Sequence, residues 1–396
     1  MLQRLEHHLS FRMPLYRAGL TLIIMFLGLI LFVDMSGARV TGPCANCHTM
    51  HNSQDGGAMN FDNSTQPNNL LLRTGNCVGC HAQGGPSNII DLGGCETPQV
   101  YHTDGIDLAG GNFAYIDGTK GSGAFDGKGH NVIDLVQQDS VLAVPPGGPI
   151  QGGHTHPTTM VANLTCAGLY GCHGNAHFQD PMASMQGAHH GAGSSHPTGD
   201  TTANSFRFML GVEGLEISDW QNTNATHHNE YKKDLHQATG PWVNACGWCH
   251  GPDNPWHGNS GDVLAPGSGI NYLCLRCHPR FHSGTNTGGN INNPPWFKHP
   301  VNVAIPDKTE YSAFTTYNVD APVARNDIPN APSPVVTPGR TAQWGVGEDY
   351  VACISCHKAH GTDYPDILRW DYSTIIAAGG SNTNGCFICH TTKDDP

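Results

Sequence analysis

The longest hydrophobic stretch of this chain lies near its start, where residues 20–33 form an apolar run of 14. Beyond it, apolar residues come in short groups interrupted by Gly and Pro, and the stretch from Ser205 to Leu215 is the more regular part. Sustained periods of two or 3.6 residues mark long strands and helices, and they are missing here. The pattern predicts mostly irregular coil with short α-helices and few strands.

The apolar run fits an export signal. Arg4, Arg12 and Arg17 precede it, and the small residues Ser36-Gly37-Ala38 follow it as a cleavage site. The run is shorter than the roughly 20 residues of a membrane span, although a retained anchor is the alternative. We therefore assign residues 1–38 as a signal peptide and expect an exported protein, extracellular or at the cell surface, with the periplasm as the alternative.

Composition gives little material for a conventional core. Only 38% of the 396 residues are hydrophobic, and Gly (50) and Pro (27) are abundant. Such a composition is typical of loop-rich or disordered chains unless something else supplies apolar surface. The net charge of −13 argues against nucleic acid as a partner.

A short cysteine motif recurs along the chain. Six copies read Cys-X-X-Cys-His, the attachment pattern of c-type haem. They are Cys44/Cys47/His48, Cys77/Cys80/His81, Cys246/Cys249/His250, Cys274/Cys277/His278, Cys353/Cys356/His357 and Cys386/Cys389/His390. Two thiols one helical turn apart can each form a thioether to a haem vinyl group, and the following His then ligates the iron. A zinc site or redox dithiol is the alternative, but neither requires a His after every pair.

A seventh motif is expanded. Cys166 and Cys172 are separated by five residues, and His173 follows directly. We interpret it as a haem site with a longer loop; the alternative is a Cys166–Cys172 disulfide beside an unrelated His. In chain order the seven motifs are called sites 1 to 7, so the expanded motif is site 3.

Seven sites imply seven covalently bound c-type haems. Their porphyrins would replace much of the missing core, so the fold is expected to be coil wrapped around a chain of haems, and the haem-free chain is expected not to fold. Seven pairs use 14 of the 15 cysteines. The remaining Cys95 is interpreted as a buried thiol, with an intermolecular bridge as the alternative.

The sequence has enough histidines to give each iron a second axial ligand. His51 and His360 follow a motif His by three residues and His282 by four, so each is better placed to ligate a neighbouring haem than its own. The distal candidates are His51, His130, His189, His190, His228, His282, His299 and His360. Further candidates in reserve are His102, His154, His156, His177, His196, His227, His236 and His257. For any one of them a surface or capping role is the alternative.

The motifs divide the chain into regions without a fixed repeat length, so a solenoid is not indicated. The segment after site 2 is Gly-rich and is expected to form loops and a short hairpin over 101–150. A Pro-rich segment with aromatic residues is expected to be an extended strap over the surface. The regions are 39–150 (sites 1 and 2), 151–240 (site 3), 241–300 (sites 4 and 5), 301–345 (the strap) and 346–396 (sites 6 and 7).

Several segments resemble the multihaem c-type cytochromes of metal-reducing bacteria, of the doubled Cys-X-X-Cys-His kind. They are residues 44–54, 166–174, 187–190, 206–211 and 228–231. The resemblance implies bis-His ligation and low-potential electron transfer, and some relatives of this type polymerise into extracellular filaments, or nanowires.

The expected function is an electron conduit for extracellular electron transfer, not an enzyme. The conduit is either a filament subunit with haem–haem contact between copies or a discrete shuttle, and other redox proteins or extracellular electron acceptors are its expected partners. A multihaem oxyanion reductase is the contrasting alternative, although the sequence has no Cys-X-X-Cys-Lys motif. Haem storage has no feature in its favour.

Overall fold

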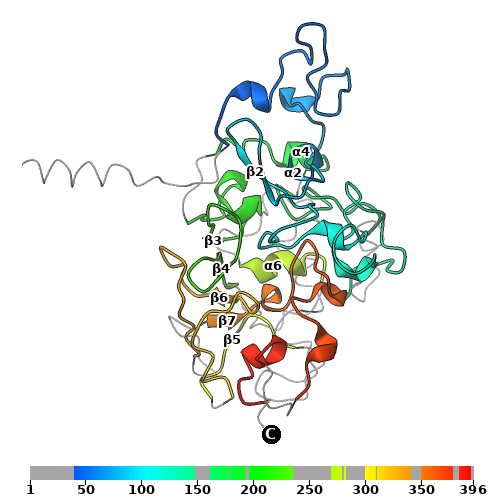
Figure 1. The fold of residues 1–396 in the computed structure, drawn as a ribbon. Helices are drawn as coiled ribbons and strands as arrows, with labels where there is room; N and C mark the ends of the chain where they lie inside the picture. Colours follow the sequence, from blue (N-terminus) through cyan, green and yellow to red (C-terminus); the bar gives the residue numbers. More distant parts are fainter. Residues whose placement is uncertain are drawn as a thin grey trace, which may run out of the picture. The chain divides into compact units, whose positions relative to one another are not determined.

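The computed structural model describes residues 40–147, 161–176, 178–191, 196–234, 269–278, 281, 299–308, 310–339, 349–377 and 383–393. The chain divides into two compact units, Met1–Ser36 and Gly37–Pro396, and every described residue belongs to the second. The predicted signal peptide and site 4 lie outside the described residues. Figure 1 shows that irregular backbone dominates this unit, as the hydrophobic pattern predicted.

The helices are short, and several of them are the motifs themselves. The α-helices are α2 (Val78–His81), α4 (Pro181–Ser184) and α6 (Ile270–Leu275). Turns of 3-10 helix span Cys44–Asn46, Asn69–Leu71, Phe113–Tyr115, Asp126–Lys128, Thr202–Asn204, Phe206–Phe208, Cys353–Ser355, Pro365–Ile367, Tyr372–Thr374 and Gly385–Ile388. Helical backbone at a motif brings its two thiols to one side, because residues three apart share a helical face.

A hairpin follows site 2 directly. Strands β1 (Ile89–Asp91) and β2 (Glu96–Pro98) pair antiparallel, with Ile89 opposite Pro98. Gly93 and Gly94 have positive φ in the connecting turn, a conformation that only Gly adopts without strain. The hairpin expected within residues 101–150 was wrong in position, since the described part of that segment, 101–147, has turns and no strand.

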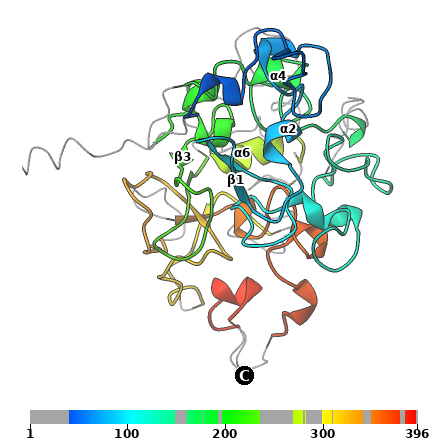
Figure 2. The ribbon, with the colours of Figure 1, turned by 45° about the horizontal axis from the view of Figure 1, so that its top comes forward.

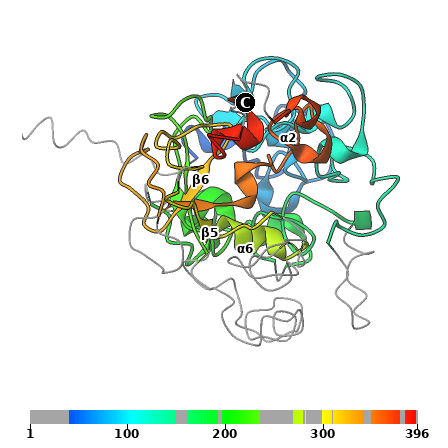
Figure 3. The same ribbon diagram turned by 90° about the horizontal axis from the view of Figure 1, so that it is seen from below.

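The second sheet has five very short strands. They are β3 (Gly214–Leu215), β4 (Glu230–Lys232), β5 (Val303–Ala304), β6 (Val323–Arg325) and β7 (Asp349–Val351). Their order is β3-β4-β6-β7-β5; β4 and β6 are parallel and the other pairs antiparallel. The turned views in Figures 2 and 3 show the sheet strands among loops from distant parts of the sequence.

The Pro-rich segment is not a surface strap, and that expectation is corrected. It contributes strands β5 and β6, and Phe314, Tyr317 and Val323 are almost fully buried in one hydrophobic cluster. A second cluster joins Phe206, Tyr231, Leu273 and Tyr350 beside the sheet. The aromatic residues among the prolines explain the difference, because burying them stabilises the fold more than covering a surface would.

Among the described residues, no helix has the length and apolar character needed to cross a membrane.

Candidate haem-binding sites

Each described motif closes with the same backbone hydrogen bond. The motif His N–H donates to the carbonyl of the first Cys at sites 1, 2, 3, 5, 6 and 7, at 2.8–3.1 Å. Site 3 closes in this way despite its longer loop, with His173 N 3.1 Å from Cys166 O. Cys166 and Cys172 are both free thiols, so the disulfide alternative is not observed. The expanded motif therefore presents two thiols and a His as the standard motifs do.

Five motif histidines face a second imidazole. The pairs are His48 with His190, His81 with His189, His173 with His360, His278 with His130 and His390 with His299. Their ring centroids are 5.9–6.3 Å apart. An imidazole bound to a metal through a bond of about 2 Å has its ring centre about 3 Å from that metal, so two imidazoles on opposite sides of one ion have centres about 6 Å apart. The pairs have the spacing of axial ligands to one iron.

The motif imidazoles are oriented by hydrogen bonds at Nδ1. Backbone carbonyls accept from five of them: Leu70 from His48 (3.2 Å), Pro98 from His81 (2.9 Å), Arg207 from His173 (2.7 Å), Pro146 from His278 (2.8 Å) and Asp366 from His357 (2.8 Å). At site 7 the acceptor is the Glu310 carboxylate, 2.6 Å from His390 Nδ1. A neutral imidazole that donates through Nδ1 keeps the Nε2 lone pair for a metal.

Burial favours the neutral form of several of the paired imidazoles by lowering their pKa, and three show it most strongly. It lowers the pKa of His189 and of His278 to about 4, with a smaller contribution from neighbouring histidines. Burial, together with the nearby His173, lowers the pKa of His360 to about 3. The neutral form is the one that ligates iron.

Three of the carbonyl acceptors lie on strained turns. Each turn has two successive non-Gly residues at positive φ, and the first of them accepts the His proton. The turns are Leu70-Leu71 at site 1, Arg207-Phe208 at site 3 and Asp366-Ile367 at site 6. Left-handed backbone costs roughly 1–2 kcal/mol per residue, and such strain persists where surrounding contacts fix it at functional sites.

Sequence reasoning missed these turns, yet sites 1 and 6 share a signal that could have found two of them. Leu72-Arg73 and Leu368-Arg369 follow the strained residues. Arg73 N donates to Cys47 O at 2.9 Å, and Arg369 N donates to Cys356 O at 2.9 Å. The Leu-Arg pair thus ties the turn back to its own motif in both places.

Thiols of successive sites influence one another. Burial, with a smaller contribution from Cys47, raises the pKa of Cys80 to about 11 and thereby links sites 1 and 2. Hydrogen bonds join Cys166 to Cys77 and Cys274 to Cys353, and they raise the pKa of Cys166 and Cys274 far above the usual range. Burial also raises the pKa of Cys172, and the nearby Cys274 adds to the effect. Burial raises the pKa of Cys356 to about 11, with a smaller contribution from Cys386.

Because such influences weaken with distance, they indicate that the thiols of each linked pair of sites lie near one another. Taken in turn, the links connect the described sites in the order 1-2-3-5-6-7. In Figures 1 and 2 the backbone of site 1 (blue) and that of site 7 (red) lie well apart.

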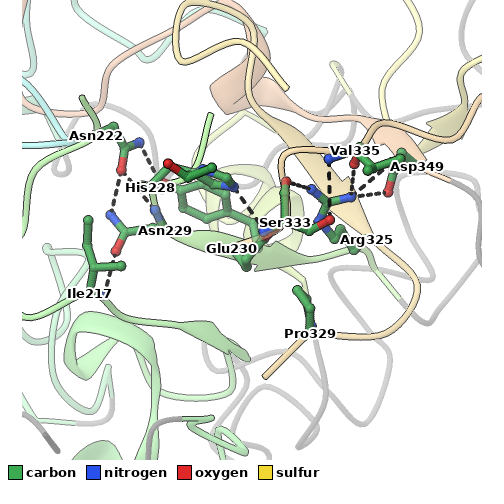
Figure 4. A network of polar contacts seen from close by, with 12 residues as sticks. Ile217, Asn222, His228, Asn229, Glu230, Arg325, Pro329, Ser333, Val335 and Asp349 are labelled. Carbon is green, nitrogen blue, oxygen red and sulfur yellow. Dashed lines mark hydrogen bonds and ion pairs between the residues drawn. The ribbon is translucent and has the colours of Figure 1, made fainter. Parts of the chain in front are cut away.

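His228 was proposed as a distal ligand, but the structure places it in a buried charge network (Figure 4). Its Nε2 lies 3.1 Å from Glu230 Oε1, and its ring stacks on Tyr317 at 3.5 Å between centroids. Glu230 also pairs with Arg325 at 2.5 Å, and Arg325 pairs with Asp349 at 3.0 Å. The network crosses strands β4, β6 and β7 and leaves His228 outside the five imidazole pairs.

The other candidates divide into three groups. His51 is exposed and belongs to none of the five imidazole pairs. At site 6, the motif His357 faces no second imidazole at the paired spacing within the described ranges. His102 is fully buried with Nδ1 2.5 Å from Asp104 O, His196 bonds to Pro329 O, and His227 pairs with Asp219. Candidates outside the described residues are Cys246, Cys249, His250, His282, His154, His156, His177, His236 and His257.

Cys95 is buried and has no disulfide. The interpretation as a buried thiol is therefore the one that the structure supports.

Comparison with known proteins agrees with the motif geometry. Residues 346–395 match the model of the doubled CXXCH motif. The chain is 24% identical over 388 residues to C-type cytochrome OmcS of Geobacter sulfurreducens, covering 86% of this chain and 82% of the relative. The resemblance to multihaem c-type cytochromes is confirmed.

Solved structures similar to this cytochrome-like chain come from the same organism. One is an outer membrane cytochrome S filament, with a TM-score of 0.48, 16% identity, and coverage of 91% of this chain and 93% of that chain. Another is a structure of OmcS nanowires, with a TM-score of 0.46, 18% identity and the same coverages.

Proposed function

We propose that this chain is a heptahaem c-type cytochrome that conducts electrons outside the cell. A c-type haem, when bound, supplies a reversible one-electron iron couple. The motif thiols would attach it, and the opposed imidazoles would hold its iron from both faces. The observation that carries the proposal is the set of five imidazole pairs, each uniting one motif His with one predicted distal His at 5.9–6.3 Å.

This arrangement suits electron transfer because it needs little rearrangement. Hydrogen bonds at Nδ1 orient the motif imidazoles, three of them from strained turns, so the same two ligands would serve both oxidation states. The proximity of thiols at the six described sites, 1, 2, 3, 5, 6 and 7, supports a series of redox centres. Electrons entering at one end would then pass from site to site within a single chain.

The test is a haem and ligand count on the secreted protein. Intact-mass spectrometry and the pyridine haemochrome assay are expected to give seven haems per chain, and electron paramagnetic resonance is expected to show low-spin bis-imidazole iron. Markedly fewer haems, or a dominant high-spin signal that binds carbon monoxide or nitrite, would favour the reductase alternative.

We further propose that the chain is a filament subunit, with the discrete shuttle as the alternative. Similarity to C-type cytochrome OmcS supports this, and so do exposed apolar residues near both ends of the site series. Met50, Leu70 and Leu71 are 71%, 47% and 45% exposed beside site 1. Tyr372 and Ile376 are 68% and 64% exposed, and their neighbours Trp370 and Ile375 pack on Gly385 beside Cys386 of site 7. Head-to-tail contact of two such surfaces would extend the series between copies.

A distal ligand shared between copies fits the filament form. His51 is exposed, and His357 has no facing imidazole among the described residues. We propose that His51 of one copy reaches the iron at site 6 of the next. Electron microscopy that shows only monodisperse particles of secreted protein would remove the filament form.

A further inference from the structure

Site 7 differs from the other described sites in what its motif His donates to. At sites 1, 2, 3, 5 and 6 the acceptor is an uncharged backbone carbonyl. At site 7 the acceptor is the side chain of Glu310, whose Oε1 lies 2.6 Å from His390 Nδ1. A hydrogen bond to a carboxylate is shorter and about twice as strong as one between neutral groups.

The chain holds Glu310 in this place from both sides. Thr391, the residue after His390, donates its backbone N–H and its hydroxyl to the Glu310 carbonyl, at 2.8 and 3.0 Å. Tyr311, the residue after Glu310, places its ring 5.0 Å from the His390 ring. Lys393 Nζ lies 3.7 Å from Glu310 Oε1. The backbone of Glu310 is therefore tied to the segment that carries the motif His, and its carboxylate is held between His390 and Lys393 of the same segment.

A carboxylate acceptor has a defined effect on a metal-bound imidazole. It draws the Nδ1 proton toward itself, which makes the imidazole more basic and a stronger donor to the metal. It also brings a negative charge close to the site. Both effects favour the more positive ferric iron over ferrous iron, and so lower the reduction potential.

We propose that Glu310 is a positioning residue that sets site 7 at a lower reduction potential than a backbone acceptor would give. The inference rests on the proposed function, because site 7 must hold a haem. With Glu310 as the acceptor, the haem iron of site 7 would release its electron more readily than it would with a backbone carbonyl as the acceptor. Site 7 would therefore differ in reduction potential from the other described sites. Lys393 moderates the effect through its charge.

The test compares Glu310→Gln with the wild type as full-length, haem-loaded protein in a spectroelectrochemical titration. Gln keeps the size of the side chain and removes its charge. The reduction potential of one haem component is expected to become more positive. At a fixed electrode potential its ferric-to-ferrous ratio should fall about tenfold, which corresponds to about 59 mV for one electron. The near-infrared charge-transfer band of that ferric haem is expected to move to longer wavelength, because the ligand loses imidazolate character.

Glu213→Gln is the matched control, since Glu213 also pairs with a lysine (Lys232 at 3.6 Å) and lies outside every described motif contact. This variant is expected to leave the reduction potentials of all haem components unchanged. Glu310→Asp is expected to recover part of the wild-type potential. An unchanged titration in haem-loaded Glu310→Gln, or an equal shift in Glu213→Gln, overturns the proposal.

Lys393→Met provides a second test if Glu310→Gln prevents haem attachment at site 7. The Lys393 side chain is 60% exposed, and its contact with His390 is a backbone one, in which Lys393 N–H donates to the His390 carbonyl at 3.1 Å. Met keeps that backbone bond, so haem attachment at site 7 should persist. Loss of the Lys393 charge is expected to move the same component to a more negative potential, and an unchanged potential overturns the inference. Wild-type protein that lacks haem on the Cys386–His390 peptide would instead refute the proposed function, and peptide mass mapping separates the two failures.

Discussion

At the scale of single residues, the imidazole pairs decide what each site can do. His173 and His360 illustrate this, because one belongs to the expanded motif and the other to a Cys-X-X-Cys-His-X-X-His run at site 6. The sequence suggested that His360 would ligate a neighbouring haem, and the structure places its ring against site 3. Ligation of iron by this pair stays a prediction.

His360→Ala is therefore expected to affect site 3 and not site 6. Haem attachment should persist, because the Cys166 and Cys172 thiols remain. Electron paramagnetic resonance should show the loss of one low-spin component and the gain of one high-spin component. His227→Ala, at a half-exposed His paired with Asp219, is the control and should leave the spectrum unchanged. An unaltered low-spin count in His360→Ala would contradict the assignment.

At the same scale, His228 lies in a different environment from the paired imidazoles, and we predict a structural role for it. Its Nε2 lies at Glu230 and its ring on Tyr317, within a network that also holds Arg325. His228→Phe keeps the stacking and removes the hydrogen bond, so the free energy of unfolding should fall by about 1–3 kcal/mol. The haem spectra should stay as in the wild type. Thermal unfolding followed by circular dichroism measures the first effect.

The neighbouring variant His227→Phe serves as the comparison. Its ion pair with Asp219 is about 39% exposed, and surface pairs contribute under about 1 kcal/mol. If His228→Phe lost a low-spin haem signal, His228 would be an iron ligand after all.

At the scale of elements, the strained turns show how backbone conformation serves the sites. Leu70 and Leu71 have φ of 60° and 58°, and the Leu70 carbonyl accepts from His48. The turn is held by Arg73 and by the bridge between His48 and Leu72. Without these contacts two successive left-handed leucines would relax to ordinary backbone.

Leu71 allows a test of that strain because it is about half exposed. Asn tolerates left-handed backbone, whereas β-branched Val does not. Leu71→Val is therefore expected to be less stable than Leu71→Asn by about 1–2 kcal/mol in thermal unfolding. At Ile106, which is 60% exposed and lacks positive φ, the same two substitutions should not show this order. Equal stabilities at position 71 would argue against strain.

The five-stranded sheet is the element that the sequence did not indicate. Its strands have two or three residues, too few for an alternating pattern to be recognised. Pairing is set by distant segments, as when Tyr231 lies beside Ala324 and Ala324 beside Tyr350. The short helices at the motifs were predictable because the motif itself requires a helical turn between its thiols.

At the scale of the whole molecule, haem should be required for folding. The hydrophobic clusters are small, and 38% hydrophobic residues cannot offset the entropy of ordering so much coil. Haem-free protein, made without the c-type attachment machinery, is expected to show no cooperative thermal transition by circular dichroism. A native-like cooperative transition would contradict this.

Assembly gives a second prediction at this scale. His51→Ala is expected to abolish filaments in electron microscopy while each chain keeps its covalent haems, since His51 is not in a motif. The expected spectral change is one high-spin haem per chain, at site 6. The control is His227→Ala, which should still assemble. Filaments of normal length from His51→Ala would show that no ligand is shared through His51.

The sequence by itself determined the chemistry of this protein. Thiols and a His within a few residues specify haem attachment locally, whatever the rest of the chain does, so the motifs, the expanded site 3 and the paired distal candidates could be named in advance. Only the tertiary structure decided which imidazoles face each other, which acceptor each motif His has, and where the Pro-rich segment lies. His48 and His190, or His390 and Glu310, are far apart in sequence, and contacts over such separations depend on the packing of the entire chain.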